Sequence, residues 1–399
     1  MAACSLPIVD LDAFLADPTA QEGIDTANLT ARALIEYGAL VVRDSRVSDE
    51  ANEAFLDLME DYFAQPDDVK RLDLRPEVHY QVGVTLENTE KPKCHSNEAC
   101  QAVIAALDPS ERPLDLSGRS ADPKCRFFHR MGTTPRSTAF PALNLTNVVP
   151  CAFPEWTTSL ESWGSQIKRA VEGVSEMLAV GLGLERDALT DAARYGSHLL
   201  APTATDLEKY GREGEVFAGF HTDLNFLTIH GRSRYPGLNV WARNTGKRIE
   251  VKLPPGCLLV QAGKQLEHLT GGLILAGYHE VICTSGTLSA LSNRSRADAP
   301  TRDRPKIRIS STFFYHLSND YALRPRAFHE RVKRARQLAR VGGGIRRDRP
   351  EGEEGQERDG VLSRWDKEWD ENVAGAKYEE GLLVGDLIQN ELKEIALHA

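Results

Sequence analysis

The 399-residue chain has no apolar run that could cross a membrane. A membrane-spanning helix needs roughly 18–20 consecutive apolar residues, and no stretch approaches this length. The N-terminus, MAACSLPIVDLDAF, also has no basic region and no apolar core of signal-peptide length. The sequence therefore predicts a cytoplasmic protein without a membrane partner.

Cysteine is scarce, and the C-x-x-C pattern is missing. Seven cysteines are scattered along the chain, so neither a zinc ribbon nor a redox dithiol is indicated. Cys94, His95, Cys100 and Cys125 group loosely, but their spacing matches no usual zinc site. We expect all the thiols to be reduced, as in a cytosolic protein.

Positive charge is in deficit. There are 48 basic and 58 acidic residues, which gives a net charge of −10. This balance argues against nucleic acid as a partner. Hydrophobic residues make up 41% of the chain, enough for a large core.

Helical periodicity and strand-like runs alternate in the first half of the chain. The sequence predicts a short strand in LPIVDL, a helix followed by a strand over 25–44, a helix over 49–64 and a long helix over 157–181. Residues 87–150 are rich in proline, charged residues and turn residues, and we expect an irregular segment there that does not form a domain of its own.

From residue 195 onward the sequence consists of short apolar runs separated by turn residues. Runs of this density predict a sandwich or barrel, in the form of a jelly roll. A polar stretch over 286–305 has no periodicity and interrupts the sheet as an insertion. Helices are expected over 326–341 and 361–397, with a charged, disordered linker at 346–360 between them.

The fold class we expect is mixed α+β, with a jelly-roll (double-stranded β-helix) core flanked by N-terminal and C-terminal helices. The expected regions are an N-terminal α/β region (1–150), a scaffold helix with its connection (151–194), the jelly-roll core (195–320) and a C-terminal helical extension (321–399).

The apolar run GFHTDLNFLTIHG contains His221 and Asp223 in an H-x-D triplet. On a strand both side chains point to one face, which places two metal ligands together. Two imidazoles and one carboxylate can hold Fe(II) on one face and leave coordination positions free. The third ligand has two candidates, His268 and His279. We favour His279 because AGYHEVICT is strand-like, whereas His268 lies beside a diglycine turn.

Arg308 and Ser310 lie two residues apart in KIRISSTFFYH. On a strand this spacing points a guanidinium and a hydroxyl to the same side, where together they can bind one carboxylate. The sequence therefore predicts an acid co-substrate beside the metal.

This set of motifs resembles the isopenicillin N synthase-like family of 2-oxoglutarate/Fe(II) oxygenases. His279 follows Asp223 by 56 residues, as in that family's pattern of H-x-D, distal His and R-x-S. The segments LPIVDL, EYGALVVRDSRVS and FAQPDDVK also resemble the family's N-terminal region, so the similarity runs over most of residues 6–320.

The resemblance implies that His221, Asp223 and His279 bind Fe(II), and that Arg308 and Ser310 bind the distal carboxylate of 2-oxoglutarate. It implies a dioxygenase that hydroxylates or desaturates a small organic substrate with O2, releasing succinate and CO2. Asn225, Tyr195 and His198 are expected to line the substrate pocket.

The chain departs from the family pattern in two places. The family often has a tyrosine before a proline in the strand preceding H-x-D, but HLLAP (198–202) has Leu and Ala there. In addition, Arg308 follows His279 by 29 residues, more than in typical members. The 286–305 insertion accounts for the excess, and we expect it to form a lid or a partner surface.

Other functions remain open at this point. An iron-dependent oxidase of the same fold would work without 2-oxoglutarate, and a non-catalytic jelly-roll binding protein would not bind iron. A zinc hydrolase could use similar ligands, but it would leave the Arg308–Ser310 pair without a role. The sequence names neither the prime substrate nor the oligomeric state.

Overall fold

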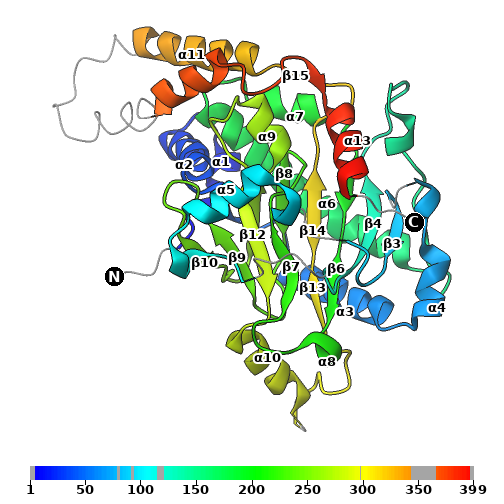
Figure 1. The fold of residues 1–399 in the computed structure, drawn as a ribbon. Helices are drawn as coiled ribbons and strands as arrows, with labels where there is room; N and C mark the ends of the chain where they lie inside the picture. The colour runs from blue at the N-terminus through cyan, green and yellow to red at the C-terminus, as the bar shows by residue number, and fades with distance from the viewer. Residues whose placement is uncertain are drawn as a thin grey trace.

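Two β-sheets and the helices around them make up the fold (Figure 1). The computed structural model describes residues 5–78, 81–90, 94–114, 121–296, 298–342 and 365–395. The predicted linker at 346–360 lies outside these residues. Helices and strands occur together throughout, so the predicted mixed α+β class is confirmed.

The larger sheet has ten strands and collects segments from both halves of the chain. Its order is β1-β2-β11-β8-β14-β5-β4-β6-β13, with β3 paired to β4. Only β1 and β2 pair in parallel; the other pairs described for this sheet are antiparallel. Its strands are β1 (Ile8–Asp10), β2 (Ala39–Arg43), β3 (Gly83–Thr85), β4 (Cys125–Met131), β5 (His198–Leu200), β6 (Thr203–Asp206), β8 (Leu227–His230), β11 (Cys257–Ala262), β13 (Ile307–Ser310) and β14 (Thr312–Tyr315).

The smaller sheet has four antiparallel strands in the order β10-β9-β12-β7. They are β7 (Val216–His221), β9 (Leu238–Trp241), β10 (Arg248–Glu250) and β12 (Tyr278–Ile282). A separate pair, β15 (Ala322–Leu323) with β16 (Leu382–Leu383), ties the C-terminal segment to the body of the molecule.

The main hydrophobic core lies between the larger sheet and the N-terminal half's helices. Helix α6 (Trp156–Gly181) buries one long face of apolar side chains against α2 (Gln21–Tyr37) and the sheet. Helix α3 (Asp49–Phe63) begins at Ser48, whose hydroxyl accepts a hydrogen bond from the N–H of Ala51. The helices predicted over 49–64 and 157–181 are therefore confirmed.

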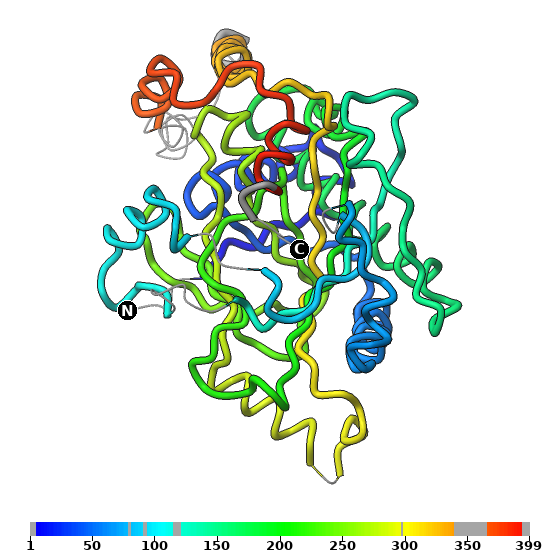
Figure 2. The backbone as a smooth tube through the Cα atoms, turned by 45° about the vertical axis from the view of Figure 1, so that its right-hand side comes forward, coloured from blue at the N-terminus to red at the C-terminus, as the bar shows by residue number. Residues whose placement is uncertain are grey.

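The remaining helices cover the sheets and the two ends of the molecule. Figures 1 and 2 place α11 and the C-terminal helix α13 at one end and α10 at the other. Among the described residues no helix is long and apolar enough to cross a membrane. The helices are α1 (Leu11–Ala16), α4 (Asp67–Lys70), α5 (Glu98–Ala106), α7 (Ala188–Ala193), α8 (Leu207–Tyr210), α9 (Lys264–Leu269), α10 (Ser285–Ser295), α11 (Pro325–Gly342) and α13 (Val384–Ile395).

Several predicted elements were wrong. Within 87–150, helix α5 and strand β4 are regular, and β4 is an interior strand of the larger sheet. The 286–305 insertion begins with the helix α10, which Thr284 and Thr287 start with a reciprocal capping box. The C-terminal helix is not continuous, because turns and β16 separate the helical residues 365–374 from α13.

The expectation of reduced thiols was also wrong for one pair. Cys94 and Cys100 form a disulfide at the start of α5. Their spacing of six residues matches no short redox or zinc motif, so the sequence alone did not reveal the pair. Both cysteines pack with Phe220 and Trp241 on the outer face of the smaller sheet.

Candidate metal centre

His221, Asp223 and His279 meet at one point between the two sheets. His221 ends β7 and lies directly opposite His279 in the antiparallel pairing of β7 with β12. Asp223 Oδ1 lies 3.8 Å from His221 Nε2 and 3.9 Å from His279 Nε2. One ligand atom from each residue lies within 4.8 Å of the others, and no other such group occurs in the described part of the chain.

Backbone carbonyls orient the two imidazoles. His221 Nδ1 lies 2.6 Å from the carbonyl oxygen of Gly219, and His279 Nδ1 lies 3.3 Å from that of Gly277. A carbonyl oxygen can only accept a hydrogen bond, so each Nδ1 carries the proton. Each Nε2 then offers its lone pair to the space beside Asp223, which is the arrangement that metal-binding histidines use.

The protonation states at the centre suit a metal cation. Burial, with a smaller contribution from His279, lowers the pKa of His221 to about 3. For Asp223, burial raises the pKa, but the two histidines and the Thr228 hydroxyl together outweigh it and hold the pKa at about 2. At neutral pH a neutral His221 imidazole and the Asp223 carboxylate therefore face one another, as metal binding requires.

Arg308 is a buried cation that has no carboxylate partner among the described residues. Its Nη1 donates to Ser310 Oγ at 3.2 Å, and its Nε is buried with no hydrogen-bond partner. No Asp or Glu of the described residues forms an ion pair with it, and burial lowers the pKa of the guanidinium to about 10. An unpaired buried charge is costly, so this position fits an anionic group supplied by a ligand.

A cavity between the sheets joins the metal centre to the Arg308–Ser310 pair. The larger sheet contributes polar side chains to its wall, and the smaller sheet contributes apolar ones together with His221 and His279. The lining residues are Arg126, Thr203, Thr205, Phe217, Ala218, His221, Asp223, His230, Leu238, His279, Val281, Arg308, Ser310 and Thr312.

The structure places the three predicted substrate-pocket residues outside this lining. Asn225 is buried behind the centre, with its Oδ1 3.1 Å from Thr228 Oγ1. Strand β7 ends at His221, so strand alternation does not continue to residue 225. Tyr195 is 42% exposed and its N–H donates to Ser318. His198 lies in the core, stacked on Tyr315 with ring centroids 4.5 Å apart.

His268, the less favoured third ligand, lies in α9 away from the other two. Its Nε2 lies 2.6 Å from the carbonyl oxygen of Glu379 and therefore donates to it. The described group of potential ligands contains His279 and does not contain His268.

Two cavity residues were not assigned to the site from the sequence. His230 lies on β8 and contacts Gln261 Nε2 at 3.1 Å and Thr312 Oγ1 at 3.2 Å. Arg126 belongs to a basic cluster in the sequence, yet strand alternation sends it to the cavity and sends His129 into the core. The chain bends between β7 and β8, so the alternation of side chains along β7 does not continue into β8. The sequence therefore did not predict that His230 points into the cavity.

Comparison with known proteins finds similar sequences among oxygenases. Residues 195–317 match the family model of the 2OG-Fe(II) oxygenase superfamily. The chain is 27% identical over 128 residues to flavonol synthase/flavanone 3-hydroxylase of Petunia hybrida, covering 32% of this chain and 36% of the relative. It is 29% identical over 182 residues to validamycin A dioxygenase of Streptomyces hygroscopicus subsp. limoneus, covering 43% and 49%. The chain thus spans less than half the length of either curated relative.

The fold extends the likeness over the whole chain. A full-length Neurospora crassa protein, solved in complex with alpha-KG, superposes with a TM-score of 0.64 at 16% identity, covering 98% of this chain and 97% of that one. The matched domain contains His221, Asp223, His279, Arg308 and Ser310. Residues 195–317, which include all five of these residues, are thus similar to the 2OG-Fe(II) oxygenase superfamily, the family whose model they match.

Proposed function

We propose that this protein is an Fe(II)- and 2-oxoglutarate-dependent dioxygenase that hydroxylates or desaturates a small organic molecule. In this proposal His221, Asp223 and His279 hold Fe(II), and Arg308 with Ser310 holds the distal carboxylate of 2-oxoglutarate. The observation that carries the proposal is the shared cavity, in which a metal-ligand triad and a buried guanidinium without a carboxylate face the same space.

Bound Fe(II) and 2-oxoglutarate would supply the oxidising chemistry. In the overall reaction, O2, 2-oxoglutarate and the substrate give the oxidised product, succinate and CO2. The protein's own residues bind and orient. Gly219 and Gly277 fix the imidazoles, Thr228 holds the second oxygen of Asp223, and Arg308 fixes one end of the keto acid. The apolar side chains of Phe217, Leu238 and Val281 exclude water between the two ends of the cavity.

We further infer that the two sheets form a double-stranded β-helix, or jelly roll, with its core at 195–320. Regions 1–150 and 151–194 would then act as scaffold, and 321–399 as a C-terminal extension. The strand pairing supports a scaffold role, because β2 pairs with β11 and β4 pairs with β5 and β6, while β1 and β3 extend the larger sheet by pairing with β2 and β4.

A succinate assay tests the proposed function. Protein loaded with Fe(II) should convert 2-oxoglutarate to succinate slowly by itself, and faster with a suitable small molecule, with one CO2 per succinate. O2 uptake without succinate would favour the oxidase of the same fold. Absence of both activities and of iron binding would leave a binding protein and refute the proposal.

A further inference from the structure

The insertion between β12 and β13 lies beyond one end of the cavity. Its helix α10 follows β12 directly, and Figure 1 shows it beneath the ends of β7, β12 and β13. The strand register shows how far the apolar residues lie from the metal centre. His279 pairs with His221 at the metal centre, whereas Val281, two residues further along β12, pairs with Ala218 and Leu238. Two residues along a strand span about 7 Å, so the apolar walls lie between the metal centre and α10.

Apolar side chains of α10 pack against these walls. Phe217, Ala218 and Val281 belong to one buried cluster with Cys283. On α10, three side chains pack against the same cluster: Leu288, Ala290 and Leu291. Because Phe217, Ala218 and Val281 also line the cavity, the α10 side chains pack directly behind its apolar wall.

Ion pairs hold the insertion against α3. Glu60 of α3, whose side chain is 1% exposed, lies 3.2 Å from Arg294 Nη2 and 3.4 Å from Arg304 Nη2. Arg304 also pairs with Asp61 at 2.8 Å. These contacts tie the insertion to α3.

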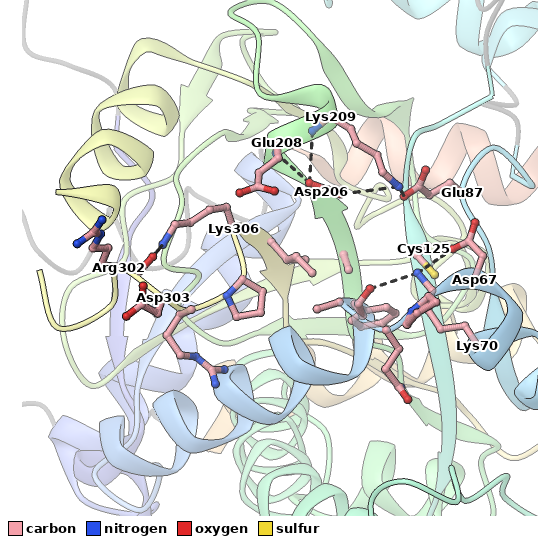
Figure 3. A pocket seen from close by; sticks show the side chains of 18 residues that line it. Asp67, Lys70, Glu87, Cys125, Asp206, Glu208, Lys209, Arg302, Asp303 and Lys306 are labelled. Atoms are coloured by element: carbon pink, nitrogen blue, oxygen red, sulfur yellow. Dashed lines mark hydrogen bonds and ion pairs between the residues drawn. The ribbon is translucent and has the colours of Figure 1, made fainter. Parts of the chain in front are cut away.

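The loop after α10 faces a different space. Its charged side chains Arg302, Asp303 and Lys306 line one side of a second cavity of about 660 Å³, across from Glu87 and Lys209 (Figure 3). Lys306 is held by three backbone carbonyls, of Arg294, Thr301 and Arg302. The leucines of α10 thus pack behind the apolar wall of the first cavity, whereas Arg302 and Asp303 of the following loop face the second cavity.

We propose that α10 sets the length of the co-substrate pocket, so that the enzyme selects the five-carbon 2-oxoglutarate over longer 2-oxo diacids. This inference rests on the proposed function, because it assigns the anion at Arg308 to the distal carboxylate of the keto acid. Arg308 is on β13, which starts directly after the insertion. A six-carbon acid anchored at the metal centre would push its distal carboxylate toward the floor that α10 supports.

The test compares the binding of 2-oxoglutarate and 2-oxoadipate to Fe(II)-loaded protein without O2, through the visible charge-transfer band of the chelated keto acid. In the double variant Leu288→Ala/Leu291→Ala, the affinity for 2-oxoadipate relative to that for 2-oxoglutarate should rise by about tenfold. This is the effect expected when a fitted pocket gains room for one methylene. Ser289→Ala and Ser292→Ala change exposed residues of the same helix and should leave the ratio unchanged.

A second variant keeps the inference testable if the double variant does not fold. Ala290→Leu adds bulk to the same face and should weaken 2-oxoglutarate binding, whereas Fe(II) binding stays as in the wild type. An unchanged ratio in a folded double variant, or unchanged binding in Ala290→Leu, contradicts the role of α10. Wild-type protein that binds iron but gives a band with neither acid contradicts the proposed function itself.

Discussion

Asp122 Oδ1 accepts a hydrogen bond from the backbone N–H of Gly219 at 3.1 Å. The carbonyl of the same glycine accepts from His221 Nδ1, so Asp122 supports the strand residue that orients one imidazole. Lys124 holds Asp122 at 2.7 Å and pairs with Glu90 at 3.0 Å. This ion network comes from residues outside the matched family domain and reaches the metal centre from the N-terminal region.

Asp122 is therefore expected to act as a positioning residue for His221. Asp122→Ala should weaken Fe(II) binding about tenfold, the usual cost of removing a group that orients a ligand. Asp122→Asn keeps an oxygen acceptor for Gly219 and should retain most of the affinity. Anaerobic calorimetry gives the Kd, with the exposed Asp298→Ala as control. Equal loss in both Asp122 variants would assign the effect to the Lys124 ion pair instead.

Arg308→Met should weaken 2-oxoglutarate binding strongly and leave Fe(II) binding intact. Removing one partner of a buried charged contact costs at least about 2 kcal/mol, or roughly 30-fold in Kd. Arg302→Met removes the same charge at an exposed position and should bind the keto acid normally. Unchanged affinity in Arg308→Met would place the carboxylate elsewhere, with Arg126 as the remaining arginine of the cavity wall.

Glu90 should make the fold sensitive to acid. Burial raises its pKa, but Arg126 and Lys124 outweigh this and lower the pKa from 4.5 to about 2. Because the pKa is lower in the folded state, the carboxylate stabilises the fold above pH 4.5, and this contribution is lost as the pH falls toward 2. The shift corresponds to roughly 3 kcal/mol.

Urea denaturation of wild type and Glu90→Gln at a series of pH values checks this expectation. The variant should be less stable at neutral pH, and the difference should shrink steadily below pH 4.5. A difference that does not depend on pH would show that the Glu90 carboxylate is not selectively stabilised in the folded protein.

The cysteines should separate into three classes on alkylation. Cys151 is exposed and should react in the native protein, whereas Cys125 is buried and burial raises its pKa to about 12, so it should not. Cys94 and Cys100 should react only after reduction, which should lower the free energy of unfolding by about 2 kcal/mol for so short a loop. Peptide mass spectrometry reads each site, and labelling of Cys94 without a reductant would contradict the disulfide.

The sequence predicted the long helices and the motif residues because local periodicity determines both. The helix over Trp156–Gly181 repeats its apolar face for 26 residues, and the H-x-D and R-x-S motifs need only strand alternation around them. Pairing of His279 with His221 could be anticipated because both lie on strand-like runs.

Other features depend on contacts that local patterns do not encode. Asn225 was expected on the face of Asp223, but the chain bends after His221 and turns its side chain away. The sequence of helix α10 shows little amphipathic pattern, because serines surround its leucines. The packing of these leucines behind the cavity wall could therefore not be predicted from the sequence. The support of Gly219 by Asp122 joins residues 97 positions apart, which no motif search detects.

The most direct test of the account is an anaerobic titration with Fe(II) and 2-oxoglutarate of wild type, His279→Ala and His268→Ala. Wild type and His268→Ala should develop the charge-transfer band of a chelated keto acid, and His279→Ala should lose it, because only His279 lies with His221 and Asp223. A band that persists in His279→Ala but disappears in His268→Ala, or no band in any protein despite bound iron, would contradict the assignment of the metal centre.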